Sequence, residues 1–265
     1  MDVLLIVSGT GVGWYNIILI DAFSLLRMTI AFISDLHLTP DRPASTELFE
    51  SFIGEADKYL RQLYILGDLF EYWIGDDGSE VLGHRSVEQA LKHTVDKGTE
   101  VFFLHGNRDF LIGEAFADRT GCQLLTDPVI IEPDGQKILL THGDALCTDD
   151  LEHQQARHQM LSSKWKMAFL QQSIEDRRQA AGALRAKSES GKQNKPMEIM
   201  DVNQQAVEKM MRTHGVEVMI HGHTHRPAVH EFLLDGELAR RYVLGDWYTQ
   251  KSAIFYNDGK LTLRK

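Results

Sequence analysis

The sequence predicts an α/β fold in which strands and helices alternate along one chain. Short apolar runs recur from Met28 onward, and each ends in glycine or in an acidic or histidine residue. Between them lie stretches whose apolar residues recur at helical spacing, a pattern typical of α/β proteins. A chain of 265 residues with 43% hydrophobic and 25% charged residues can form one large core, so we expect one domain.

Five apolar runs are predicted to be buried strands because they are short and rich in Val, Ile, Leu or Phe. In chain order they are Thr29 to Ile33, Leu63 to Leu66, Val101 to Leu104, Lys137 to Leu140 and Val216 to Ile220. The stretches Glu47 to Arg61 and Val87 to Lys97 are predicted helices. From Pro227 to Lys265 the pattern favours further strands, with hairpin turns at Asp235-Gly236 and at Asn257-Asp258-Gly259.

The segment between Asp149 and Asp201 has a different character, because it is polar, helical in period and without a strand-like run. Between residues 151 and 195 it carries nine Lys or Arg against four Asp or Glu. A basic helical insertion in an acidic protein is a candidate lid over an anionic substrate or a surface for anionic lipid. A solvated helical hairpin fits the charge equally well. We place the predicted lid at residues 150–200.

Charge and cysteine content exclude two classes of protein. The net charge of −10 and the pI near 5.6 argue against a general nucleic-acid binder, which needs surplus Lys and Arg. Cys122 and Cys147 are too few for a disulfide framework or a zinc knuckle. Two isolated cysteines are more simply interpreted as free thiols of a protein in a reducing compartment.

Residues 1–27 are apolar and contain no Lys or Arg before Arg27. A secretory signal would begin with positive charge and end at a small-residue cleavage site, and neither is clear here. The acidic residues Asp2 and Asp21 argue against a membrane anchor. Because Met28 opens a complete strand, we interpret residues 1–27 as an extension translated from an upstream start and expect the domain to span residues 28–265.

Seven candidate metal ligands directly follow the predicted strands. They are Asp35, His37, Asp68, Asn107, His142, His223 and His225. Ligands bind at the carboxyl ends of strands in α/β sheets, so these loops converge if the strands are neighbours. In Asp35-Leu36-His37, a two-residue step would place both side chains on one side of an extended backbone. Glycine beside the ligands would let the backbone approach the metal ions.

The ligand types predict two divalent cations. Carboxylate, amide and imidazole groups without thiolate suit manganese, iron or zinc. We assign Asp35, His37 and His225 to one ion, Asn107, His142 and His223 to the other, and Asp68 as the bridge. Two ions about 4 Å apart that share a hydroxide suit in-line displacement at phosphorus. One Asp-x-His is weak, since a lone His is more often an ordinary hydrogen-bonded residue, but five motifs in one order are hard to obtain by chance.

The pattern D-x-H, GD, GN, H and GH-x-H resembles the calcineurin-like metallophosphoesterase superfamily. The resemblance implies a two-sheet sandwich flanked by helices, with a dimetal site at the strand ends. Longer motifs are similar to those of the lipid A biosynthesis diphosphatases that act on UDP-2,3-diacylglucosamine, and the similarity covers residues 28–265. These motifs are Ser34 to Leu38, Gly67 to Asp77, His105 to Gly113, Thr141 to Asp144, Ile199 to Val202, His221 to Pro227 and Leu244 to Trp247.

The resemblance implies hydrolysis of UDP-2,3-diacylglucosamine to UMP and 2,3-diacylglucosamine 1-phosphate (lipid X) with two Mn²⁺. It also implies peripheral attachment to the cytoplasmic face of a bacterial inner membrane, and no obligate protein partner is evident. By family position, the expected substrate contacts are Asn107, Arg108, Asp150, Ser188, Lys192, Lys195 and His223, with Asn194 as a substitute for Lys192. A soluble nucleotide diphosphatase or phosphodiesterase and a non-catalytic scaffold of the same fold are the alternatives.

Arg108 is a departure from the wider superfamily, many of whose phosphatases have His after the Gly-Asn pair. Arginine cannot act as a proton donor at working pH, but it can neutralise charge on phosphoryl oxygens. A site without that acid suits a good leaving group, such as one half of a diphosphate. We therefore predict that Asp68, Asn107, Arg108 and His142 form the catalytic set and that the substrate is an anhydride.

An apolar stretch in the predicted lid favours a lipid substrate. Its residues are Met160, Leu161, Trp165, Met167, Ala168, Phe169 and Leu170, with Lys164 and Lys166 among them. Acyl chains need an apolar groove, and a substrate in a membrane needs a docking surface. A helix stripe that packs on the core is the alternative.

Overall fold

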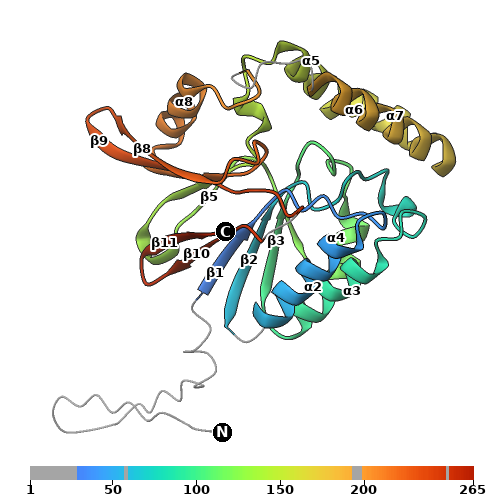
Figure 1. Ribbon diagram of the computed structural model, residues 1–265, viewed down its shortest axis with the longest axis horizontal. Helices are drawn as coiled ribbons and strands as arrows, with labels where there is room; N and C mark the ends of the chain where they lie inside the picture. Colours follow the sequence, from blue (N-terminus) through green and yellow to red (C-terminus); the bar gives the residue numbers. More distant parts are fainter. Residues whose placement is uncertain (1–28, 57–58, 193–198, 249–250) are drawn as a thin grey trace, which may run out of the picture.

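The computed structural model describes residues 29–56, 59–192, 199–248 and 251–265. Two β-sheets pack against each other, and helices cover the outer face of each (Figure 1). A core cluster that includes Phe32 and Leu66 of one sheet and Leu140 and Ile220 of the other fills the space between them. The predicted two-sheet α/β sandwich is confirmed. The predicted extension, residues 1–27, lies outside the described residues.

The six-stranded sheet has the order β11-β10-β1-β2-β3-β4. Its strands are β1 (Thr29–Ile33), β2 (Leu60–Leu66), β3 (Glu100–Leu104), β4 (Gln123–Leu125), β10 (Ala253–Asn257) and β11 (Lys260–Arg264). The first four run parallel, and β10 and β11 are antiparallel additions. Alternate residues of β1 face different cores, Ile33 under the helices and Phe32 between the sheets. Burial on both faces explains why these runs are continuously apolar.

The five-stranded sheet has the order β5-β6-β7-β9-β8. Its strands are β5 (Val129–Ile131), β6 (Ile138–Leu140), β7 (Val218–His221), β8 (Ala228–Leu234) and β9 (Glu237–Val243). Both predicted hairpin turns are confirmed, since Asp235-Gly236 joins β8 to β9 and Asp258-Gly259 joins β10 to β11. All four of these turn residues have positive φ, as a two-residue hairpin turn of this kind requires.

Among the described residues, four helices flank the sheets. The six-stranded sheet is covered by α2 (Pro43–Ala56), α3 (Arg85–Asp96) and α4 (Glu114–Thr120), and the other sheet by α8 (Gln204–His214) (Figure 1). Short 3₁₀ turns are η1 (Asp76–Gly78), η2 (Pro133–Gly135) and η3 (Asp144–Leu146). The helix predicted from Val87 to Lys97 is confirmed within one or two residues at each end.

Several predicted element ends were wrong. Helix α2 begins at Pro43 rather than at Glu47, and β2 begins at Leu60 rather than at Leu63. The helix predicted to reach Arg61 stops at Ala56, because Leu60 is fully buried as the first residue of β2 and pairs with β1. The strand predicted from Val216 begins at Val218. Gly215, in the left-handed region, ends α8, and Val216 donates its N–H to the carbonyl of Met211 as part of that helix cap.

The predicted lid is helical, and it forms three helices: α5 (Leu151–Leu161), α6 (Ser163–Leu170) and α7 (Ile174–Lys192). Asp150 caps α5 by accepting the N–H of His153, and Ser162 caps α6 by accepting the N–H of Trp165. Figure 1 shows the three helices grouped together beside the sandwich, on the side opposite the β10–β11 hairpin. None of the helices in the described part of the chain is long and apolar enough to span a bilayer.

Candidate metal centre

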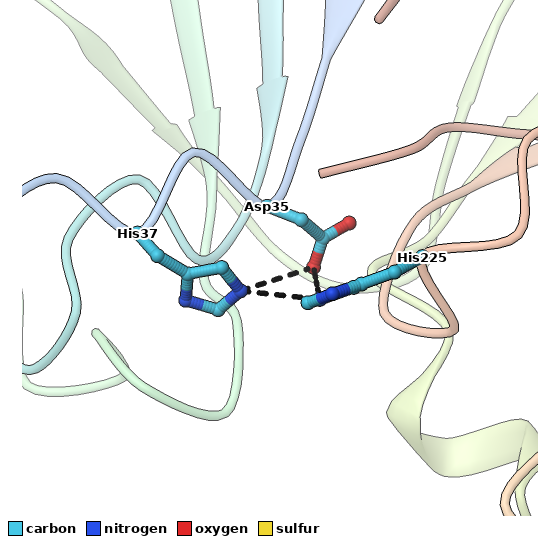
Figure 2. A group of neighbouring side chains, drawn as sticks. All are labelled: Asp35, His37 and His225. Carbon is cyan, nitrogen blue, oxygen red and sulfur yellow. Dashed lines mark hydrogen bonds and ion pairs between the residues drawn. The ribbon is translucent and has the colours of Figure 1, made fainter. Parts of the chain in front are cut away.

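The seven predicted ligands all lie in loops that directly follow strands. Those after β1, β2 and β3 come from one sheet, and those after β6 and β7 come from the other. In the described part of the chain, two groups of side chains have ligand atoms within 4.8 Å of one another. They are Asp35, His37 and His225 (Figure 2), and Asp35, Asp68 and His142. The predicted convergence is therefore confirmed for these five residues, across both sheets.

The first group has the spacing of atoms that share a cation. Nε2 of His37 lies 3.1 Å from Nε2 of His225, which lies 3.4 Å from Oδ1 of Asp35. Metal bonds of about 2.1 Å place neighbouring ligand atoms about 3 to 3.5 Å apart. Oδ1 of Asp35 is buried and accepts no hydrogen bond of ordinary geometry from a described residue. The three residues therefore fit a divalent cation.

Asp68 lies between the two groups. Its Oδ1 is 3.7 Å from Nε2 of His142, and its Oδ2 is 4.0 Å from Nε2 of His37. Two oxygens directed to different groups are what a bridging carboxylate requires, which supports the role predicted for Asp68. Oδ1 of Asn107 lies 3.1 Å from Nε2 of His142, so the amide joins the second group. The sequence prediction did not foresee that Asp35 would belong to both groups.

His223, in the loop after β7, lies beside the second group. Its ring centroid lies 5.2 Å from that of His142, and its backbone N–H donates to Oδ2 of Asp35 at 2.8 Å. Burial and the neighbouring His142 hold the pKa of His223 well below its usual value. The imidazole is therefore neutral at working pH, which is the form that binds a metal ion.

The backbone at the proposed ligands is strained. Asp35, His37, Asp68, His223 and His225 have φ between 49° and 68°, in the left-handed region that non-glycine residues rarely adopt. The other described non-glycine residues with positive φ are Asp134, Asp235 and Asp258, which lie in turns. The predicted extended step from Asp35 to His37 is therefore wrong. The strand ends at Ile33, and both residues turn back toward the centre.

Hydrogen bonds between loops hold these conformations. The N–H of Asp35 donates to the carbonyl of Gly67, and the N–H of His37 to that of Asp68. Glycine is required where the loops come closest. A Cβ on Gly106 would lie 2.1 Å from Oδ1 of Asp68, and one on Gly222 would lie 2.3 Å from Oδ2 of Asp35. The predicted use of glycine beside the ligands is confirmed at these two positions by close approach.

Two supporting carboxylates were missed by sequence reasoning. Asp109 is fully buried and accepts the N–H groups of Gly106, Asp68 and Leu69, so it ties the loop after β2 to the loop after β3. Asp246 lies 3.3 Å from Nδ1 of His225 and orients that ring. Both residues stood in quoted motifs, but their roles depend on contacts between loops that spacing does not reveal.

A buried arginine fixes the proton on His221, the residue before the last ligand loop. Nη1 of Arg241 lies 3.0 Å from Nε2 of His221, and a guanidinium can only donate. Nε2 must therefore accept, so the ring hydrogen is on Nδ1, which donates to the carbonyl of Gly222 at 2.8 Å. This pair holds the turn from which His223 and His225 extend.

The electrostatics of the centre favour a cation. Burial, together with Asp109 and Asp35, raises the pKa of Asp68 to about 7 against the opposing effect of His142. Burial lowers the pKa of His225, but Asp35 and Asp246 outweigh burial and raise it to about 10. The buried carboxylates therefore concentrate negative charge at this site and raise the pKa of the neighbouring His225. Divalent cations would offset the negative charge of the carboxylates.

A cavity of about 430 Å³ extends from the proposed metal centre into the lid. Its polar end is lined by His37, Asp68, Asn107, Arg108, His223 and His225, and its apolar end by Met160, Leu161, Trp165, Phe169, Ala181 and Leu184. Among the predicted substrate contacts, Asn107, Arg108, Asp150, Ser188 and His223 line this cavity. Lys195 and the side chain of Lys192 lie outside the described residues.

Comparison with known proteins gives concordant matches. The calcineurin-like phosphoesterase family profile matches residues 28–227. A UDP-2,3-diacylglucosamine hydrolase of Aromatoleum aromaticum is 47% identical over 221 residues, which cover 83% of this chain and 90% of that protein. Proteins of the same name are 45% identical in Pseudomonas aeruginosa, covering 86% of this chain and 94% of that protein, and 44% identical in Aeromonas salmonicida, covering 90% and 93%.

Proposed function

This chain belongs to the calcineurin-like phosphoesterase family, and we propose that it hydrolyses UDP-2,3-diacylglucosamine to UMP and 2,3-diacylglucosamine 1-phosphate in lipid A biosynthesis. The observation that carries this proposal is the cavity, which has the metal-binding cluster at one end and the apolar lid residues at the other. A substrate with a diphosphate at one end and two acyl chains at the other matches both. A soluble nucleotide would leave the apolar end unused.

The residues of the cluster supply the binding part of the mechanism. Asp35, His37 and His225 would hold one Mn²⁺, Asn107, His142 and His223 the other, and Asp68 both. When bound, the two cations neutralise phosphoryl charge and make water a nucleophile at neutral pH. The cluster combines carboxylate, amide and imidazole groups without thiolate, which suits manganese, iron or zinc, and we choose manganese because the family resemblance implies it.

Arg108 acts at the diphosphate. Its backbone N–H donates to Oδ1 of Asp68 at 2.8 Å, and the residue lines the cavity beside Asn107. The guanidinium stays charged and stabilises negative charge on the phosphoryl oxygens. It supplies no proton, so the reaction depends on a leaving group that needs none, here the sugar phosphate. Attack at the phosphorus nearer uridine gives UMP.

The lid provides the apolar surface for the acyl chains. Trp165 stacks on Phe169 with ring centroids 4.8 Å apart and also contacts Phe110. Phe169 is buried in the core under the lid, while Trp165, Met160 and Leu161 are partly buried against it. The helix stripe therefore packs on the core and also lines the cavity, which supports the proposed binding of acyl chains there.

The outer side of the lid supports peripheral attachment to the cytoplasmic face of the bacterial inner membrane. Leu151 and Met167 are 70% and 61% exposed, and Leu170 is also exposed. Exposed apolar side chains on helices that carry basic residues suit an anionic bilayer surface. Sedimentation with vesicles tests this: Met167→Glu should release the protein from phosphatidylglycerol vesicles and leave hydrolysis of a small diester unchanged. Equal binding of both forms would contradict the attachment.

Isotope labelling tests the reaction. Incubation with UDP-2,3-diacylglucosamine and Mn²⁺ in ¹⁸O-water should give UMP that carries the label and unlabelled 2,3-diacylglucosamine 1-phosphate. Label in the lipid product would contradict the site of attack. No release of UMP, together with rapid cleavage of a soluble dinucleotide, would favour the soluble nucleotide diphosphatase.

A further inference from the structure

One buried carboxylate holds two arginines that come from distant parts of the chain. Glu71, in the loop after β2, is 3% exposed. Its Oε2 pairs with Nη2 of Arg42, from the loop after β1, and its Oε1 pairs with Nε of Arg185, from α7 of the lid, at 2.5 Å. Each carboxylate oxygen thus accepts one guanidinium. A carboxylate is rarely buried unless it is paired in this way.

Arg42 connects Glu71 to the proposed metal centre. The same Nη2 donates to the carbonyl of His37 at 2.7 Å. The guanidinium also lies 4.4 Å from the ring centroid of Tyr248, and that ring stacks on the imidazole of His37. Since His37 has a φ of 49°, its backbone needs such support to keep the imidazole in place.

Arg185 connects Glu71 to the cavity wall. It lies on α7 one turn from Ala181 and Ser188 and next to Leu184, and all four residues line the cavity. Another contact, made by Arg177 of α7 with Asp77 and the carbonyl of Ile74, holds the same helix to the core. Contacts such as those of Arg177 would be sufficient if they only had to attach the lid to the core. The Glu71 contact differs because it ends at the metal-binding loop.

We infer that Glu71 is a positioning residue. Through Arg185 it holds the cavity-facing side of α7 in place, and through Arg42 it connects that side to the backbone of His37. This inference rests on the proposed function, since the positioned wall is the one that would receive the lipid-linked substrate. Without the carboxylate, two guanidinium groups would face each other across a buried space, and Arg185 would turn away because it is the more exposed of the two.

Glu71→Gln tests the inference, with Asp77→Asn as a matched control that weakens the other arginine contact of the same helix. At saturating Mn²⁺, Glu71→Gln should raise KM for UDP-2,3-diacylglucosamine about tenfold, with kcat lowered less than about threefold. Hydrolysis of bis(p-nitrophenyl) phosphate should stay within about twofold of wild type. Mn²⁺ affinity, measured by calorimetry, should fall about threefold in Glu71→Gln and stay unchanged in Asp77→Asn.

A double variant shows whether Glu71 acts through Arg185. Arg185→Ala alone should raise KM as Glu71→Gln does, and the two changes together should add little. Additive effects, or parallel loss of both substrates with a lowered Tm, would overturn the inference while UMP release by wild type stands. Absence of UMP release by wild type would instead contradict the proposed function, and the inference with it.

Discussion

The two ends of the cavity are built in different ways. The metal end consists of loops between strands, with buried polar side chains and with left-handed backbone at five of its seven proposed ligands. The lid end consists of ordinary helices, whose apolar side chains are partly buried on the core and partly exposed. The strained backbone is at the metal end, where the reaction would need fixed geometry. The partly buried apolar side chains are at the lid end, where a long apolar group would bind. Under the proposed function, reaction class and substrate choice belong to different parts of the chain.

The largest effect should come from removing the carboxylate between the two metal groups. Asp68→Ala should lower kcat/KM more than about 10³-fold on both UDP-2,3-diacylglucosamine and bis(p-nitrophenyl) phosphate, because both proposed ions lose a ligand. Metal content by mass spectrometry and both rates give the result. Retention of activity on either substrate would show that the two substrates are not cleaved at one metal centre that depends on Asp68.

A change at the lid end should separate the two substrates. Trp165→Ala removes a ring from the apolar wall and should raise KM for UDP-2,3-diacylglucosamine about tenfold while the small diester is cleaved within about twofold of wild type. Gln179→Ala, an exposed residue of α7, is the control. Equal loss on both substrates would mean that the lid supports the metal end as well.

Residues that hold the metal-binding loops in place should affect the affinity of the protein for Mn²⁺. Arg241→Met removes the donor that fixes the tautomer of His221, and Mn²⁺ affinity should fall about tenfold. Arg240→Met, at the neighbouring position of β9 but paired with exposed Glu231, is the matched control. If both variants bind Mn²⁺ like wild type, the His221 turn does not position the ligands.

The smallest effect concerns how the free energy of unfolding depends on pH through the buried residue His84. Burial lowers the pKa of His84 to about 4, and its ring packs on Phe70. The unfolded chain binds the proton near the usual pKa of about 6.5, so stability should fall as pH drops from about 6.5 to 4. His84→Gln should reduce that fall by about 2 kcal/mol in urea titrations. An unchanged pH slope would contradict a neutral buried His84.

The composition of the metal centre was predictable because ligand type and position carry its chemistry. Asp68, Asn107 and His142 each follow a short apolar run, and strand ends converge in an α/β sheet. Its geometry was not predictable. An Asp-Leu-His triplet is compatible with an extended backbone, and only hydrogen bonds between loops hold Asp35 and His37 in the left-handed region.

The same limit applies to the supporting residues and to the lid. Asp109 and Glu71 act through backbone groups and arginines that are distant in the sequence, so no local pattern marks them. The helical character of the lid followed from its period, but its separation into α5, α6 and α7 depends on local caps such as Ser162. The end of α2 was misplaced because residues around Leu60 satisfy both helical and strand patterns until β2 pairs with β1.

The most direct test of the two-ended cavity is the ratio of kcat/KM for UDP-2,3-diacylglucosamine to that for UDP-N-acetylglucosamine, measured as UMP release with saturating Mn²⁺. The two substrates share the diphosphate and differ in the acyl chains that the lid would bind. A ratio above about 10² is predicted, since burial of acyl chains contributes binding that the soluble sugar lacks. A ratio near one would contradict the claim that the lid selects the substrate.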